Sequence, residues 1–312
     1  MDYERMTGFY QQFKAFFQAE DMNHIAKQIG WFHRQRKLTA FHLVLALLAA
    51  MLATTAKTIT QLQGIFAVLT AQSISYQPFY DKLRHPQCAV FFQHLLRLLL
   101  SRWSLQVLAP SKESKLSNFE DILIQDGSSL RLHRDLAGVY PGRWDHSPAA
   151  VEIHLTYSLF QEKPVRLVIA PDKFAEKHYL LEACKAKGKL ILLDRGYFDR
   201  HYVAQVKQAG GDVLVRAKSN LNPRIVGLIC DGKHQPIAHL PLKSIRSQIF
   251  GKNIDAIVRW KDLDFDFRLL GLWNPKTNVH IWLLTTLGMD WEATEIGQLF
   301  RLRWQVELCF KE

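Results

Sequence analysis

Two apolar runs in this chain each end in an aspartate, and this repeated pattern constrains the fold more than any other feature. Residues 121–126 read DILIQD and residues 189–194 read KLILLD. Asp126 and Asp194 therefore close segments that are typical of buried strands. In α/β folds, ligands bind at the carboxyl ends of the strands. We expect a mixed α/β sheet that presents both carboxylates at one edge, although an aspartate after a strand is also a common turn or helix-cap residue.

The first third of the chain has a different pattern. Residues 1–110 contain long apolar-periodic segments and few glycines, which predicts a separate helical amino-terminal domain. Within it, residues 58–66 and 75–84 have the helix, turn, helix outline of a DNA-reading unit. Two amphipathic helices that pack in a bundle would give the same pattern, so both interpretations stay open at this point.

Strand and helix patterns alternate in the second part. Residues 119–217 contain predicted strands at 121–126 and 129–133, with helices at 175–186 and 200–209, the latter capped by Asp199. This order predicts an α/β domain.

The last third begins with strands and ends with a helix. Residues 218–287 are rich in strand patterns, and residues 288–312 contain a final helix for which Asp290 is a suitable N-cap. On that helix Phe300, Arg303 and Glu307 share one face, because offsets of three and four residues align side chains. We therefore expect Glu307 to supply a third carboxylate.

The charge of the chain indicates its partners. Lys and Arg number 40 against 29 Asp and Glu, a net charge of +11, which favours a polyanion such as nucleic acid. The longest apolar stretch, residues 40–53, is shorter than the roughly 20 residues needed to cross a bilayer. The first residues also lack the pattern of a signal peptide. We predict a cytoplasmic protein without a membrane partner.

The three acidic residues lie in motifs that resemble a known family. Asp126 begins D-G-S, Asp194 begins D-R-G-Y, and Arg303 and Glu307 fit a signature of the form Tyr-x2-Arg-x3-Glu-x6-Lys. In this order the motifs resemble those of the IS4-family DDE transposases. The resemblance implies that Asp126, Asp194 and Glu307 are catalytic residues and metal ligands, and that Arg303 binds a DNA phosphate.

The resemblance also implies a fold and an activity. Residues 119–217 and 288–312 would form a ribonuclease H-like catalytic core, interrupted by a β-rich insertion at 218–287. The activity would be metal-dependent cleavage at transposon ends followed by strand transfer into target DNA, with two Mg²⁺ or Mn²⁺ ions as cofactors. The partners would be double-stranded DNA and a second copy in a DNA-bound dimer. A bacterial cytoplasmic location, with association with the nucleoid, follows from the same family.

Two departures from the signature leave alternatives open. Phe300 stands where the family has Tyr, and the signature Lys would fall at position 314, beyond Glu312. We therefore expect a signature helix that is truncated at its carboxyl end. One alternative is an inactive transposase remnant that only binds DNA. Another is a cellular metal-dependent nuclease, because one fold can carry several functions.

Overall fold

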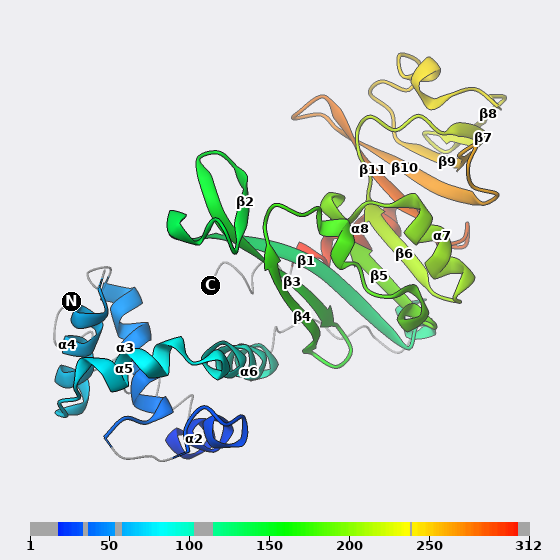
Figure 1. Ribbon diagram of the computed structural model, residues 1–312. Helices are drawn as coiled ribbons and strands as arrows, with labels where there is room; N and C mark the ends of the chain where they lie inside the picture. Colours follow the sequence, from blue (N-terminus) through cyan, green and yellow to red (C-terminus); the bar gives the residue numbers. More distant parts are fainter. Residues whose placement is uncertain (1–17, 34–36, 54–57, 103–114, 238, 305–312) are drawn as a thin grey trace. The chain divides into compact units, whose positions relative to one another are not determined.

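The computed structural model describes residues 18–33, 37–53, 58–102, 115–237 and 239–304 (Figure 1). The chain divides into two compact units, Met1–Leu99 and Leu100–Glu312. The described elements of the first unit are helical: α2 (Ala19–Gln28), α3 (Ala40–Ala53), α4 (Ile59–Thr70), α5 (Tyr76–Arg84) and α6 (Pro86–Arg102), which continues into the second unit.

The first unit packs around aromatic side chains. Trp31 is fully buried, its ring lies 4.8 Å from that of Phe91, and its indole N–H donates to the carbonyl of Lys82 at 3.0 Å. Helix α4 begins with a capping box, in which the Thr58 hydroxyl accepts from the Gln61 N–H and the Gln61 side chain accepts from the Thr58 N–H. These contacts account for helices at the positions expected from residues 58–66 and 75–84.

The second unit is built on one mixed sheet of eleven strands (Figure 1). Its strands run in the order β2-β3-β1-β5-β6-β11-β10-β9-β7-β8, and β4 also pairs with β3, along residues 151–158. Their bounds are β1 (Asp121–Arg131), β2 (Pro141–Trp144), β3 (Ser147–Ser158), β4 (Lys163–Pro171), β5 (Lys189–Leu193), β6 (Asp212–Arg216), β7 (Arg224–Cys230), β8 (Lys233–Gln235), β9 (Ile254–Arg259), β10 (Asp266–Asn274) and β11 (Val279–Thr285).

Strand β1 lies at the centre of the mixed pairing. It runs parallel to β5, with Ile124 opposite Leu192 and Gln125 opposite Leu193, and antiparallel to β3. The prediction of two strands divided after Asp126 was wrong, because β1 is continuous to Arg131. Its pairing with β3 supplies backbone hydrogen bonds as far as Arg131 opposite Ala150. The partner β5, by contrast, ends at Leu193.

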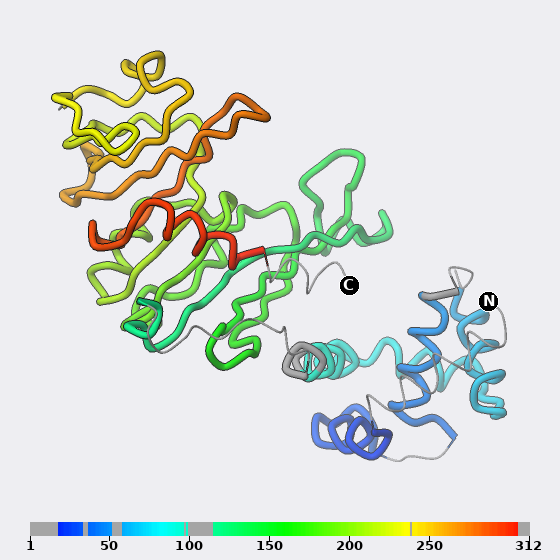
Figure 2. The backbone as a smooth tube through the Cα atoms, turned by 180° about the vertical axis from the view of Figure 1, so that it is seen from behind, coloured from blue at the N-terminus to red at the C-terminus, as the bar shows by residue number. Residues whose placement is uncertain are grey.

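Two helices lie on opposite faces of this sheet (Figures 1 and 2). Helix α7 (Arg200–Gln208) buries Val203 and Val206 in a core cluster with Ile191 and Leu193 of β5. Asp199 accepts from the N–H groups of His201 and Tyr202, which confirms the predicted cap. Helix α8 (Ala293–Arg301) covers the other face. It packs closely there, because a Cβ atom added to its Gly297 would lie 3.3 Å from the Leu272 side chain of β10.

The predicted helix at residues 175–186 was wrong. Two short 3-10 turns, η3 (Glu176–Tyr179) and η4 (Ala183–Ala186), flank an extended segment at Leu180. The buried Gln125 side chain imposes this break, since it donates to the carbonyl of Tyr179 at 2.7 Å and accepts from the N–H of Leu181 at 3.2 Å. A tertiary contact thus overrides the local helical pattern.

The predicted N-cap of the last helix was also misplaced. Helix α8 starts after Glu292, whose backbone N–H donates to the Glu295 side chain at 2.8 Å, in a capping box. The N-cap residue Glu292 and Glu295 in the first turn therefore mark the start of the helix in place of Asp290. Within the described ranges no helix is long and apolar enough to span a membrane.

Strands β7 to β11 extend the sheet beyond β6. Strand β11 pairs antiparallel with β6, with Leu284 opposite Val215, and β10 and β11 form a hairpin across the Asn274–Thr277 turn. The segment that separates the Asp194 motif from α8 in sequence thus joins the same sheet. The chain can then return along α8 to the edge where Asp194 lies.

Candidate active site

Asp126 and Asp194 are brought together by the register of two parallel strands. Gln125 of β1 lies opposite Leu193 of β5, so the next residue on each strand is an aspartate. Side chains alternate along a strand, which places Asp126 on the face of Ile124 and Asp194 on the face of Leu192. Because Ile124 and Leu192 are opposite each other, both carboxylates emerge on one face. This is the face that α8 covers.

Arg303, just after α8, links the two carboxylates. Its Nη1 donates to Oδ2 of Asp126 at 2.9 Å, and its Nη2 lies 3.7 Å from Oδ1 of Asp194. The side chains of Arg303 and Asp126 are only 4% and 11% exposed, so this ion pair is largely shielded from water. One guanidinium thus neutralises part of the charge of two adjacent carboxylates.

The two aspartates suit a divalent ion. Their oxygens converge on a single cationic group, and carboxylate oxygens are the ligands that Mg²⁺ and Mn²⁺ prefer. Oδ1 of Asp194 is buried and accepts no hydrogen bond from any residue that the structure describes. Such an atom fits a role as a metal ligand.

The predicted third ligand, Glu307, lies outside the described residues, as does the rest of 305–312. Among the residues that are described, no three Asp, Glu, His or Cys side chains form a metal-binding group. The structure thus brings together three residues of the predicted site: Asp126, Asp194 and Arg303.

A basic pocket opens beside Asp194. It has a volume of about 610 Å³, and its cationic side chains are Arg143, Lys173, Arg195 and Lys218, against the carboxylates of Asp194 and Glu176. Within the described part of the chain, no carboxylate pairs with Lys173, Arg195 or Lys218. Four cations against two carboxylates give the lining of this concave site a net charge of +2, which would attract an anion such as a phosphate.

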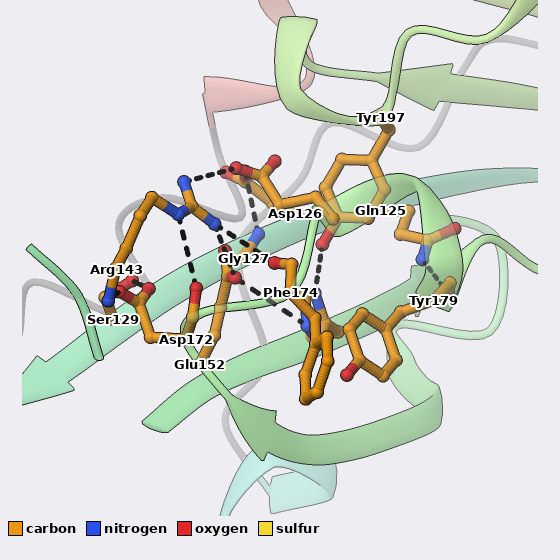
Figure 3. A network of polar contacts seen from close by, with 12 residues as sticks. Gln125, Asp126, Gly127, Ser129, Arg143, Glu152, Asp172, Phe174, Tyr179 and Tyr197 are labelled. Atoms are coloured by element: carbon orange, nitrogen blue, oxygen red, sulfur yellow. Dashed lines mark hydrogen bonds and ion pairs between the residues drawn. The ribbon is translucent and has the colours of Figure 1, made fainter. Parts of the chain in front are cut away.

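A second group of charged residues lies near the two aspartates, and Figure 3 shows two of its members, Arg143 and Glu152, together with Asp126. Glu152 of β3 is buried, and Glu176 of η3 is half-buried. Arg143 lies between them, with Nη2 at 3.3 Å from Glu152 and Nη1 at 3.8 Å from Glu176. Burial, together with the charges of Glu176, Asp172 and Asp126, raises the pKa of Glu152 to about 7, although Arg143 opposes this rise.

A histidine and a tyrosine complete this network. The hydroxyl of Tyr197, from the D-R-G-Y motif, lies 2.7 Å from Nδ1 of His154, whose ring stacks on Tyr179 with centroids 4.1 Å apart. Burial, reinforced by the charges of Arg166 and Arg143, lowers the pKa of His154 to about 4. His154 is thus a neutral hydrogen-bonding residue that orients Tyr197.

The motif analysis missed Arg143, Glu152 and Glu176. None of them adjoins an apolar run that ends in an acidic residue, which was the signal that identified Asp126 and Asp194. Glu152 carries a weaker signal, because it is a charged residue within the strand pattern AVEIHLTYS. Arg143 lies outside every predicted strand and helix, and Glu176 lies in the segment that was wrongly predicted as a helix, so only the tertiary structure brings them to the site.

Comparison with known proteins gives consistent results. The transposase of insertion sequence element IS231F from Bacillus thuringiensis subsp. israelensis is 22% identical over 222 residues, which cover 70% of this chain and 46% of that protein. The IS231B transposase from subsp. berliner is 24% identical over 202 residues, 64% of this chain and 42% of that protein. The chain therefore matches less than half the length of these relatives.

A solved structure of piggyBac transposase, in a synaptic complex with hairpin DNA, aligns with 96% of this chain and 66% of that chain. The alignment has a TM-score of 0.45 and 11% identity. The family model described as "Transposase DDE domain" matches residues 117–312, which include the whole sheet and both aspartates. This chain therefore belongs to the transposase DDE domain family.

Proposed function

We propose that this chain catalyses DNA transposition, in which it cleaves the ends of a mobile element and joins them to target DNA. The observation that carries the proposal is the placement of Asp126 and Asp194 in register on one sheet face, where both approach a single cation. Paired carboxylates of this kind bind the ions that phosphodiester transfer requires. Family membership supports the same reaction.

The fold that we propose for the catalytic part is ribonuclease H-like. Its support is the order β4-β3-β1-β5-β6, in which the first strand lies beside a later parallel strand and each carries one aspartate. We propose the same boundaries as the sequence predicted for the other two parts, 218–287 for the β-rich insertion and 1–110 for the amino-terminal domain. Helices α4 and α5 are candidates for contact with the element's ends.

Each proposed site residue has a defined task. Asp126, Asp194 and Glu307 would hold Mg²⁺ or Mn²⁺, as two ions. The chemistry that the metal supplies is a lower pKa for the attacking water or 3′-hydroxyl and neutralisation of the leaving oxygen. Arg303 would hold a phosphate oxygen by charge-assisted hydrogen bonds.

The pocket cations provide the binding surface for DNA in this proposal. The wall of this concave site includes Lys173, Arg195, Lys218 and the proposed metal ligand Asp194. A DNA strand bound there would therefore pass beside Asp194. Binding that orients the scissile phosphate for in-line attack contributes to rate as well as to affinity. A dimer assembled on two ends, in a bacterial cell, follows from the family resemblance.

Cleavage of labelled DNA that carries the element's own ends tests this function directly. The unmodified chain is assayed with Mg²⁺, and Asp194→Asn serves as the matched control. We expect cleavage by the unmodified chain and none by the variant. Binding without cleavage by either protein would indicate a DNA-binding remnant, and equal cleavage by both would overturn the assignment of Asp194.

A further inference from the structure

We propose that Arg143 is a positioning residue, which sets the spacing between the backbone segments that carry Asp126 and Asp194 by holding one glutamate behind each of them. This inference rests on the proposed metal-dependent function. Arg143 lies on β2, outside every motif that identified the site. Figure 3 shows its side chain extending toward the segment around Asp126 and Gly127.

The first step of the argument is the number of segments that Arg143 joins. Its Nη2 reaches Glu152 on β3 at 3.3 Å, and its Nη1 lies 3.8 Å from Glu176 on η3. Its Nε donates to the carbonyl of Asp172 at 3.2 Å, and Nη2 donates to that of Phe174 at 3.3 Å. A planar guanidinium holds several acceptors in a fixed geometry, which Lys cannot reproduce.

The second step is where the two glutamates lie. A Cβ atom on Gly127 would stand 2.8 Å from Oε1 of Glu152, and one on Gly196 would overlap the carboxylate of Glu176. Gly127 follows Asp126 directly, and Gly196 is two residues after Asp194. Each glutamate therefore packs against the backbone of one aspartate's own motif. Displacement of either glutamate would move an aspartate.

The third step is electrostatic. Burial is the main cause that raises the pKa of both glutamates, and an aspartate adds to each rise, Asp194 at Glu176 and, as the smallest contribution, Asp126 at Glu152. Arg143 lowers both pKa values, since its positive charge stabilises the two carboxylates. Without it, repulsion among these four acids would widen the site, and octahedral Mg²⁺ tolerates such a change poorly.

The sign of the effect on metal binding tests this role. If Arg143 acted only through its charge, its removal would strengthen cation binding, because a nearby positive charge would be lost. Positioning predicts the opposite. We expect Arg143→Met to weaken Mn²⁺ binding by about tenfold or more, which is the range for outer residues that orient metal ligands. Free Mn²⁺ is measured by electron paramagnetic resonance on the 312-residue chain.

Two controls accompany this measurement. Arg259→Met removes an exposed arginine paired with Asp266 on β9 and β10, and we expect its Mn²⁺ affinity to equal that of the unmodified chain. Combining Arg143→Met with Glu152→Gln and Glu176→Gln removes the repulsion, and we expect it to restore most of the lost affinity. A general structural defect would not be rescued in this way.

Several outcomes overturn the inference. Unchanged or tighter Mn²⁺ binding by Arg143→Met would reject positioning, as would the absence of rescue. If that variant does not fold, Gly196→Ala decides the question, because its methyl group displaces Glu176 while Arg143 is kept. We expect about tenfold weaker binding there, and unchanged binding contradicts the proposal. Failure of the proposed function is distinct, since Asp194→Asn would then bind Mn²⁺ as the unmodified chain does.

Discussion

Strands β1 and β3 bury charged and polar side chains, whereas their neighbours β5 and β6 bury aliphatic ones. The buried residues of β5 and β6 are Leu190 to Leu193 and Val213 to Val215. On β1 and β3 the buried polar residues are Asp121, Gln125, Asp126, Ser147, Glu152, His154, Thr156 and Ser158.

This difference explains where the candidate site lies. Asp126 belongs to the polar half of the sheet and Asp194 follows the apolar half, so the carboxylates meet at the boundary between the two. The aliphatic strands give rigidity through close packing, while the polar strands hold charged groups in chosen positions through hydrogen bonds. A site at this boundary has closely packed aliphatic side chains on one side and hydrogen-bonded charged groups on the other. Substitutions in the two halves should therefore have different consequences.

The largest expected effect is on activity. Asp194→Asn removes a carboxylate charge needed for metal binding, and a loss of several kcal/mol of transition-state stabilisation corresponds to at least about 10³-fold in cleavage rate. Because the Asp194 side chain is 30% exposed and lies 3.7 Å from Arg303, we expect a small change in stability. Single-turnover cleavage and thermal unfolding of the same preparation check both statements. A variant that cleaves normally would remove Asp194 from the site.

A substitution in the apolar half should mainly lower the free energy of unfolding. Leu192→Ala deletes a fully buried side chain of β5, and such truncations cost about 2–5 kcal/mol of unfolding free energy. We expect the remaining folded protein to keep its cleavage activity under conditions where it is stable. Urea unfolding measures the loss. A change below about 0.5 kcal/mol, typical of surface positions, would contradict the rigid role assigned to this half.

A substitution in the polar half should lower the stability less than Leu192→Ala does, and its effect should be local. Gln125→Leu keeps the volume but removes two hydrogen bonds. The carbonyl of Tyr179 keeps Arg166 as a donor, whereas the N–H of Leu181 is left unsatisfied. One unsatisfied buried group costs about 1–3 kcal/mol. Hydrogen exchange should accelerate in residues 179–181 and stay slow in α7. Uniform acceleration across the sheet would show that the two halves do not differ in this way.

The smallest expected effect is a change in pH dependence. The pKa of Glu152 rises from 4.5 to about 7 in the folded state, so its contribution to stability is present below pH 4.5 and is lost as the pH rises to 7. The pKa of His154 falls from 6.5 to about 4, so its contribution is present above pH 6.5 and is lost as the pH falls to 4. The two groups oppose each other between pH 4.5 and 6.5.

Single substitutions should separate these opposing contributions. In Glu152→Gln the His154 contribution remains, so the melting temperature should rise more steeply with pH than in the unmodified chain. In His154→Gln the Glu152 contribution remains, and the slope should shift in the opposite direction. Calorimetric scans between pH 4.5 and 6.5 measure both slopes. Equal slopes in the two variants would show that these side chains do not titrate as their surroundings indicate.

Predictions from sequence succeeded where a residue's role follows from its own strand or helix. The apolar runs before Asp126 and Asp194 predicted buried strands, and both are buried. Asp199 predicted the start of α7. The predictions failed where a distant side chain decides the backbone, as at residues 175–186, where Gln125 binds the chain between two short turns. The end of β1 was missed because its length depends on pairing with β3.

Some features can be read from the sequence: two aspartates end apolar runs, Arg303 follows them on a later segment, and the chain carries a net charge of +11. These features depend on local patterns and on composition, which need no partner. The register of β1 against β5, which places the aspartates side by side, comes from the three-dimensional fold alone. It also decided that Arg143 joins Glu152 and Glu176 behind them. Such contacts link segments far apart in the chain, and local periodicity does not encode which distant residues will meet.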